Sequence, residues 1–189
     1  AKAFIAKTNI SLSSKVKTLS KGMVTQLHLA LVLAVDAKVL VLDEPTLGLD
    51  ILTRRQFYTH LLEEFYTEEK CIVVTTHQIE EIENILTDVA FIRDGEIVLA
   101  ESCDDLNARY QLLAVDNEHL ATAQSLKPLY STSMMGLHSM LIDLNQLPEN
   151  HVPLSDLGKV QKASLADIFV GLMSKEQVVG EKEVEGENA

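Results

Sequence analysis

The sequence lacks any apolar run long enough to cross a lipid bilayer. Its longest run lies near Leu27 to Val35, is interrupted by His28 and is closed by Asp36. A membrane-spanning helix needs about 20 apolar residues. The sequence also shows no pattern of a secretory signal peptide. We therefore expect neither a transmembrane segment nor a leader in these residues.

Positive charge is scarce in this chain. The 16 Lys and Arg residues against 28 Asp and Glu residues leave a formal net charge of -12. Because nucleic-acid backbones are bound mainly through Lys and Arg, this balance argues against a nucleic-acid partner. It is compatible with binding of a single nucleotide, since a helix terminus and a cation can neutralise phosphate charge.

Cysteine is nearly absent as well. Cys71 begins an apolar run, Cys103 follows a predicted strand, and neither has the spacing of metal ligands. Both are expected to be free thiols in a reducing cytosol. The 189 residues, 47% of them apolar, suffice for one globular core and a small appended lobe. Because the sequence opens at Ala1 in a helical pattern without Met, we expect it to be part of a longer protein.

The most informative segment is a strand that ends in two carboxylates. Four apolar residues, 39–42, run without alternation into Asp43, Glu44 and Pro45. Such runs are typical of strands buried on both faces of a parallel sheet. Carboxylates at a buried strand tip are costly unless a cation or proton chemistry uses them, so a metal and a base are predicted here. The alternative is a strand that ends in an ordinary acidic turn.

A helix is predicted ahead of this strand, from about residue 20 to Ala34. Ser20 is in position to cap it, and apolar residues on both of its sides predict a largely buried helix. Its start combines a Ser hydroxyl with Lys21 and Gly22, which together form a suitable anion site. An ordinary capped helix is the alternative for this segment taken alone.

The order of these segments resembles the nucleotide-binding domain of ABC transporters. A Leu-Ser-x-Gly-x helix start, a strand ending Asp-Glu-Pro-Thr and then Leu-Gly-Leu-Asp match the order and spacing of that family's signature motif, Walker B and D-loop. A second apolar strand follows at 71–76, and His77 directly after it matches the family's switch histidine. The resemblance covers residues 1–101 and returns weakly at 163–174, which are similar to the closing helix of many bacterial exporter ATPases.

This resemblance implies ATP and Mg²⁺ as cofactors. ATP hydrolysis needs a neutralised γ-phosphate and an aligned water. Asp43 is the expected Mg²⁺ partner, because hard cations bind carboxylate oxygen. Glu44 is the expected general base or water-orienting group, and His77 is expected to contact the γ-phosphate or the attacking water.

The resemblance also implies a second ATPase subunit. In such a dimer, Ser20, Lys21 and Gly22 would close over the ATP of the other subunit. Asp50 would cross the same interface. The nucleotide would then lie between the two subunits.

Some features depart from the family pattern. Lys21 and Met23 stand where Gly and Gln are usual, which we expect to tune the site and not to abolish it. None of the eight glycines lies in a G-x-x-x-x-G-K-S/T phosphate loop, and Gly158-Lys159 lacks both the first Gly and the Ser or Thr. The family's Gln loop is missing too. We expect these 189 residues alone to bind ATP poorly and hydrolyse none, and the intact gene product to be an ABC-type ATPase.

The remaining patterns predict an α/β architecture. Helical patterns at 51–70 and 79–86 alternate with the two strands, which predicts part of a P-loop NTPase-like parallel sheet with helices. The Asp94-Gly95 pair predicts a hairpin. A small α+β appendage should follow, with strands at 111–115 and 137–142 around a helix near 117–125, a connector at 144–162 and a last helix at 165–172. We expect domains at 1–101 and 102–174 and an acidic disordered tail at 175–189.

These features predict an ATP-hydrolysing subunit that powers transport through a separate transmembrane permease. Export is the family-level expectation, and the location would be cytoplasmic, peripheral on the inner face of the cell membrane. One alternative is a soluble ABC ATPase acting on ribosomes or DNA, which would share every motif. Another is a non-catalytic regulatory protein that uses the half-domain as a docking surface.

Overall fold

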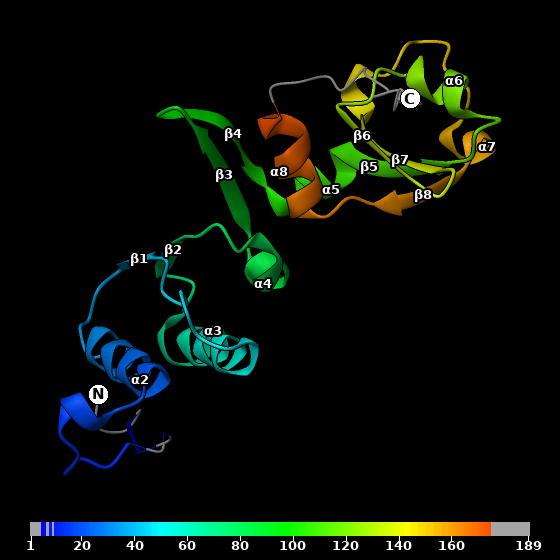
Figure 1. Cartoon of the computed structure of the whole chain (residues 1–189). Coiled ribbons are helices and arrows are strands. Elements are labelled where there is room, and N and C mark those ends of the chain that lie inside the picture. The colour runs from blue at the N-terminus through cyan, green and yellow to red at the C-terminus, as the bar shows by residue number, and fades with distance from the viewer. Residues whose placement is uncertain (1–4, 7, 9, 175–189) are drawn as a thin grey trace, which may run out of the picture. The chain divides into compact units, whose positions relative to one another are not determined.

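The computed structural model describes residues 5, 6, 8 and 10–174, which divide into two compact units, Ala1–Ile82 and Glu83–Ala189 (Figure 1). The expected domain boundary after residue 101 stays a prediction, because a division by packing does not test where the family resemblance ends. The expected acidic tail lies outside the described residues. No helix in the described part is long and apolar enough to cross a membrane.

The first unit contains a parallel pair of strands. Strands β1 (Val39–Asp43) and β2 (Cys71–Thr75) pair in register, and Asp43 lies opposite Thr75. Helix α3 (Ile51–Phe65) connects them, as a parallel crossover requires. The predicted α/β class is therefore confirmed. The other elements of the unit are η1 (Val16–Thr18), α2 (Lys21–Val32) and α4 (Ile79–Ile82).

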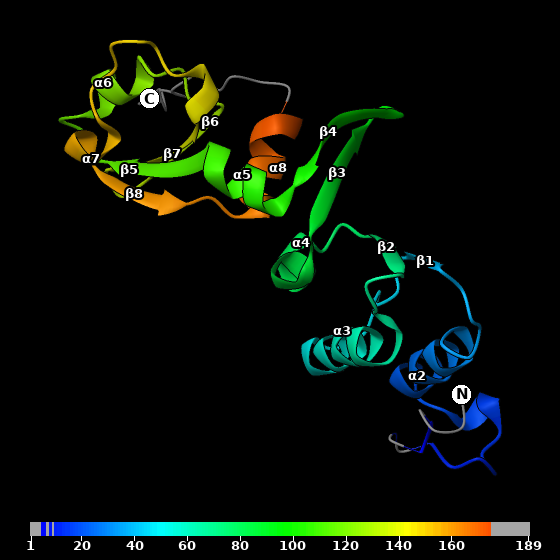
Figure 2. The same cartoon turned by 180° about the vertical axis from the view of Figure 1, so that it is seen from behind.

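The prediction that β1 is buried on both faces is wrong for the described residues. Leu40 is buried, but Val39 and Val41 are 57% and 64% exposed, and Val73 of β2 is also exposed. Side chains alternate between the faces of a strand. Helices α2 and α3 lie on the same side of the strand pair in both views (Figures 1 and 2). The valine face is therefore left open by the described residues.

Helix α2 is capped as predicted but is less buried than expected. The Met23 backbone N–H donates a hydrogen bond to Ser20 Oγ at 3.3 Å, which confirms the N-cap. Only Leu29 and Ala30 are buried, and Leu31 is exposed. The helix is apolar on most of its circumference, and its contact with α3 covers only part of it.

Helix α3 supplies much of the core of the first unit. The sequence predicts an apolar face of Tyr58, Leu61, Leu62 and Phe65; all are buried except Leu62, which is half-buried. Phe57 joins them in an edge-to-face contact with Tyr58. The helix predicted over 79–86 is shorter than expected. Its residues form α4 and then a 3-10 turn, η2 (Glu83–Ile85).

In the second unit, the predicted hairpin follows η2. Strands β3 (Asp88–Arg93) and β4 (Glu96–Ser102) pair antiparallel. Asp94 and Gly95 connect them with φ values of 54° and 84°. Positive φ at both turn positions is the geometry that an Asp-Gly hairpin favours. The predicted hairpin is confirmed.

A four-stranded antiparallel sheet follows, in the order β6-β7-β5-β8. Its strand and helix order is β-α-β-β-α-β, the ferredoxin-like arrangement. The predicted β-α-β lobe therefore lacked β6 and β8, and the connector predicted over 144–162 is wrong because it contains α7 and β8. The elements are α5 (Cys103–Arg109), β5 (Tyr110–Val115), α6 (Leu120–Gln124), β6 (Tyr130–Met134), β7 (Leu137–Asp143), η3 (Leu144–Gln146), α7 (Leu154–Leu157), β8 (Lys159–Lys162) and α8 (Leu165–Met173).

Helices pack on both faces of this sheet. On one face, Leu113 and Met140 form a buried cluster with Ala123 of α6 and with residues of α7. On the other face, α8 approaches so closely that a Cβ at Gly171 would lie 2.4 Å from Leu141 Cδ2. The predicted last helix is confirmed as α8, and Ser164 and Asp167 form a capping box at its start.

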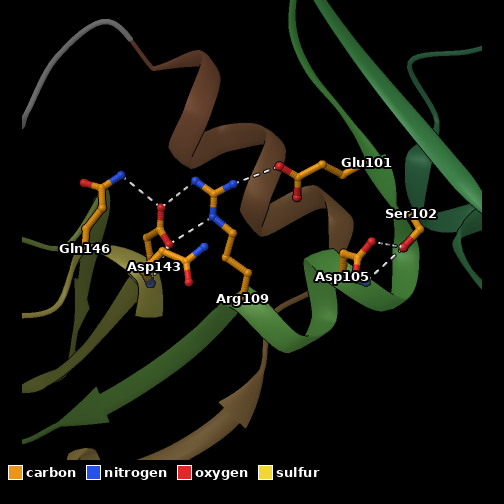
Figure 3. Close-up of polar contacts among 7 residues, drawn as sticks. Glu101, Ser102, Asp105, Arg109, Asp143 and Gln146 are labelled. Carbon is orange, nitrogen blue, oxygen red and sulfur yellow. Dashed lines mark hydrogen bonds and ion pairs between the residues drawn. The ribbon is translucent and has the colours of Figure 1, made fainter.

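A buried ion pair lies at one end of the sheet (Figure 3). Arg109 donates from Nε and Nη2 to the two carboxylate oxygens of Asp143, at 3.0 and 2.8 Å, and from Nη1 to Glu101 at 2.9 Å. Asp143 is 4% exposed. Burial alone would raise the pKa of Asp143, but the hydrogen bonds from Arg109 and its neighbours outweigh burial and lower it. Gln146 donates to the same carboxylate.

Gly158 lies so close to a neighbouring strand that any side chain at this position should clash with it. A Cβ there would lie 2.1 Å from the carbonyl oxygen of Ala114 in β5. Overpacking typically costs about 1 to 3 kcal/mol, and a backbone atom must move here. We expect Gly158→Ala to lower the free energy of unfolding of this unit by about 3 kcal/mol, measured by urea denaturation.

Gly95→Ala is the matched control for this substitution. Its Cβ would meet nothing within 4 Å, although its φ is 84°. Left-handed backbone strain alone costs about 1 to 2 kcal/mol. A loss for Gly158→Ala no larger than that for Gly95→Ala would contradict the predicted clash.

Candidate functional site

The carboxyl ends of β1 and β2 bring the predicted catalytic residues together. Asp43 and Thr75 are register partners, and the Thr75 hydroxyl donates a hydrogen bond to the Asp43 carboxylate. The Glu44 backbone N–H donates to Thr75 O at 2.9 Å. Glu44 then leaves the strand with φ of 42°, which is uncommon for a residue with a side chain. This backbone turn places its carboxylate beside the end of β2.

Glu44 and His77 form a hydrogen-bonded pair. Glu44 Oε1 lies 2.6 Å from His77 Nδ1 and accepts the His77 backbone N–H at 3.0 Å. Thr76 Oγ1 donates to Glu44 Oε2 at 3.3 Å. The side-chain hydrogen bond with His77 is the main cause of a lowered pKa of Glu44. Glu44 is therefore a carboxylate at neutral pH, and since a carboxylate only accepts, Nδ1 carries the proton of this hydrogen bond.

The turn after Glu44 leads directly into α3. Thr46 is buried in this turn, and its hydroxyl lies 3.4 Å from the Tyr58 hydroxyl. Asp50 caps α3 by accepting the Thr53 backbone N–H at 2.9 Å and the Thr53 hydroxyl at 2.7 Å. These hydrogen bonds lower the pKa of Asp50. Its carboxylate thus has a structural task within its own chain.

The start of α2 packs against this turn. Gly48 has φ of 75°, and a Cβ there would lie 1.9 Å from Lys21 Nζ. The Lys21 ammonium group therefore occupies the space that any other residue at position 48 would fill. A Cβ at Gly22 would meet Thr53 Cγ2 at 3.4 Å. The predicted nucleotide-binding residues of α2 and of the turn before α3 are neighbours in one chain.

Arg54 is a site residue that sequence reasoning missed. Its Nε donates to Leu49 O at 2.7 Å, and its Nη1 donates to Gln78 Oε1 at 3.0 Å and forms an ion pair with Glu81. It joins the turn before α3 to the segment after His77. These partners lie 24 and 27 residues away in sequence, so only the tertiary structure reveals them.

Thr75 and Thr76 were also not singled out. Their position directly before His77 at a strand end was the available signal. Both use their hydroxyls to hold a carboxylate of the site.

The donors at the strand tips fit a magnesium ion that is delivered with a nucleotide. Among the described residues, no group of three or more His, Cys, Asp or Glu side chains could hold a metal. Mg²⁺ is usually bound through one or two carboxylates together with substrate phosphates and waters. Asp43 is exposed at the strand end, beside the Thr75 hydroxyl, and both are hard oxygen donors. Asp43 therefore fits the role of a carboxylate ligand of Mg²⁺.

Comparisons with known proteins agree with these motifs. The family model described as ABC transporter matches residues 2–47. The ABC transporter ATP-binding protein YtrB of Bacillus subtilis is 31% identical over 98 residues, which are 52% of this chain and 34% of YtrB. The uncharacterized ABC transporter ATP-binding protein YhcH of the same organism is 28% identical over 184 residues, 93% of this chain and 58% of YhcH. The lantibiotic transport ATP-binding protein SrtF of Streptococcus pyogenes is 35% identical over 89 residues, 47% of this chain and 38% of SrtF.

The chain spans between 34% and 58% of the length of these three relatives. A crystal structure described as a putative cobalt transport ATP-binding protein (cbiO-2), ST1066, aligns over 84% of this chain and 52% of its own, with 18% identity and a TM-score of 0.41, too low to carry an argument. The family match and the relatives agree with the motif order, and they show that this chain is similar to ATP-binding proteins of ABC transporters over the part that carries the motifs of a nucleotide-binding domain.

Proposed function

We propose that the intact gene product binds and hydrolyses ATP and powers transport through a separate membrane permease. The observation that supports this most is the Glu44–His77 pair beside Asp43 at the ends of two parallel strands. A carboxylate held at a strand tip beside a magnesium-binding carboxylate suits activation of a water for phosphoryl transfer. Export is part of the proposal, because the segment that forms α8 is similar to the closing helix of exporter ATPases.

The geometry of the strand-tip residues supports a role for each of them in this proposal. Glu44 is ionised and acts as the general base or orients the attacking water. His77 fixes the Glu44 carboxylate through both its ring and its backbone N–H, and would contact the γ-phosphate. Asp43 would hold Mg²⁺, which when bound neutralises charge on the phosphate oxygens. The Thr75 hydroxyl orients Asp43 for this task.

A second ATPase subunit is part of the same proposal. Ser20, Lys21 and Gly22 lie at the N-terminus of α2, where backbone N–H groups favour an anion. We propose that they close over the ATP of the second subunit, with Asp50 at the interface. In this chain the ammonium group of Lys21 lies against Gly48. The assembly would lie in the cytoplasm, on the inner face of the membrane.

Nucleotide binding tests this proposal. These 189 residues contain no phosphate-loop sequence, so by themselves they should bind MgATP weakly and not hydrolyse it. Isothermal titration calorimetry should detect micromolar affinity for MgATP in the intact gene product and none in this chain. Micromolar affinity of this chain alone would contradict the second expectation. An intact gene product that neither binds nor hydrolyses ATP would overturn the proposed function.

The permease partner is tested separately by purification. The intact gene product should co-purify with a membrane subunit from solubilised membranes. Recovery with ribosomes or DNA instead would favour a non-transport ABC ATPase.

A further inference from the structure

One edge of the four-stranded sheet is free. Strand β6 pairs with β7 on one side, and no other strand of the described part lies on its second side. Residues 131–134 are exposed. An edge strand presents unpaired N–H and C=O groups, which can pair with a strand of another chain. The free edge of β6 is therefore a potential interface.

The two edges of this sheet differ in how they are protected. The opposite edge strand, β8, begins and ends with the exposed residues Lys159 and Lys162. Lysine on an edge strand discourages pairing with another chain. The segment 129–142, which contains β6, has no Asp, Glu, Lys, Arg or Pro. Among the described residues of this four-stranded sheet, the β6 edge lacks the charged residues that protect the β8 edge.

The turn after β6 carries exposed methionines. Met135 is 98% exposed and has φ of 52°, and Met134 is also exposed. Asn, Asp and Gly are the usual residues at such turn positions, so an apolar side chain held outward in this conformation is unusual. A contact that covers it would account for its presence.

We propose that β6 pairs antiparallel with β6 of a second copy of this chain, about a two-fold axis at Thr132. In this register Thr132 lies opposite its own counterpart, Ser131 opposite Ser133, and Tyr130 opposite Met134. Hydroxyl pairs across strands and methionine–aromatic contacts are both favourable. This register pairs all five residues of β6. The two four-stranded sheets become one continuous sheet.

The lack of acidic and basic residues on β6 makes this edge compatible with a second copy of the chain. Each chain carries a net charge of -12, so two copies repel each other overall, and an interface between them must lie at uncharged residues. The uncharged segment 129–142 provides that meeting place, whereas a charged peptide would find no complementary charge on β6. A two-fold interface also requires a self-complementary surface, which the pairing about Thr132 supplies. The pairing uses only the second unit and is independent of the proposed ATPase function.

Solution mass tests this pairing without nucleotide. Analytical ultracentrifugation should find the 189-residue chain as a dimer. Thr132→Lys places two ammonium groups opposite each other and should weaken dimerisation at least about tenfold, since like charges directly opposite oppose strand pairing. Gln161→Lys, on the exposed opposite edge in β8, should leave the dimer intact. A monomeric parent chain, or a dimer that Thr132→Lys does not weaken, would overturn the proposal.

Disulfide trapping gives a second readout that does not depend on the stability of the lysine variant. In a background with Cys71→Ser and Cys103→Ala, Thr132→Cys should form a cross-linked dimer under mild oxidation. Opposite residues of antiparallel strands have Cα atoms about 4.5 to 5.5 Å apart, within disulfide range. Gln161→Cys should stay monomeric on a non-reducing gel. Equal cross-linking of both variants would show random collision and count against the pairing.

Discussion

Replacing Glu44 by Gln should lower kcat for ATP hydrolysis by the intact gene product at least about 100-fold, since a general base contributes about 10² to 10⁴ in rate. Gln keeps an oxygen that accepts the His77 backbone N–H, so the segment after β2 should keep its position. What is lost is the negative charge that takes a proton from the water or orients it. ATP affinity should change little. The measurement is steady-state turnover together with MgATP titration.

A matched variant separates this effect from a general change in charge. Glu63→Gln makes the same substitution at an exposed position of α3 and should leave turnover unchanged. Slow turnover with retained nucleotide binding in Glu44→Gln alone would support the assigned role. Turnover close to that of the parent protein would remove Glu44 from the mechanism.

Replacing Arg109 by Met should lower the free energy of unfolding of the second unit by about 3 kcal/mol, because removing one partner of a buried ion pair leaves the other charge uncompensated. The buried carboxylate of Asp143 would lose two hydrogen bonds and its counter-charge. The remaining donors, the Asn145 backbone N–H and the Gln146 side chain, are neutral. Urea denaturation measures the loss.

The pH dependence gives a second test of the ion pair. In the parent chain the folded pKa of Asp143 is lowered from 3.8, so its contribution is complete above that value and is lost as pH falls through the lower, folded pKa. Without Arg109, burial should raise the pKa of Asp143 instead. The variant should then recover stability relative to the parent as the pH falls. An unchanged difference across the acid range would contradict this account.

Arg93→Met is the matched control for Arg109→Met. Arg93 donates to Leu172 O at 3.0 Å, a neutral acceptor, and its loss should cost only about 1 kcal/mol. Equal losses for the two variants would mean that packing, and not the buried charge, explains the effect at Arg109.

Local sequence patterns predicted those parts of the fold whose signals are themselves local. The Ser20 cap, the strand before Asp43 and the Asp94-Gly95 hairpin each depend on neighbouring residues, and each is present. Strand β6 was missed because its Ser-Thr-Ser centre has no apolar alternation, and β8 because it is four residues long with Lys at both ends. The composition of both segments argues against a strand, and the turns beside them gave too weak a signal to predict one.

The sequence predicted which residues form the candidate site better than it predicted the contacts that these residues make. That Asp43, Glu44 and His77 lie close together could be predicted, because they lie at or directly after the ends of two strands. Neighbouring parallel strands have their carboxyl ends at the same edge of the sheet. The burial of β1 was overestimated, because an uninterrupted apolar run does not reveal which residues cover it. The contacts of Arg54 depend on a fold that brings Gln78 and Glu81 to it.

Arg54 links two segments of the first unit that lie far apart in the sequence. Its guanidinium group holds the backbone of the turn before α3 and, at the same time, the side chains of Gln78 and Glu81. Without this guanidinium group, no side chain named here would join the turn before α3 to the segment after His77. The relative position of Asp50 and His77 therefore depends on a residue that belongs to neither of the two motifs.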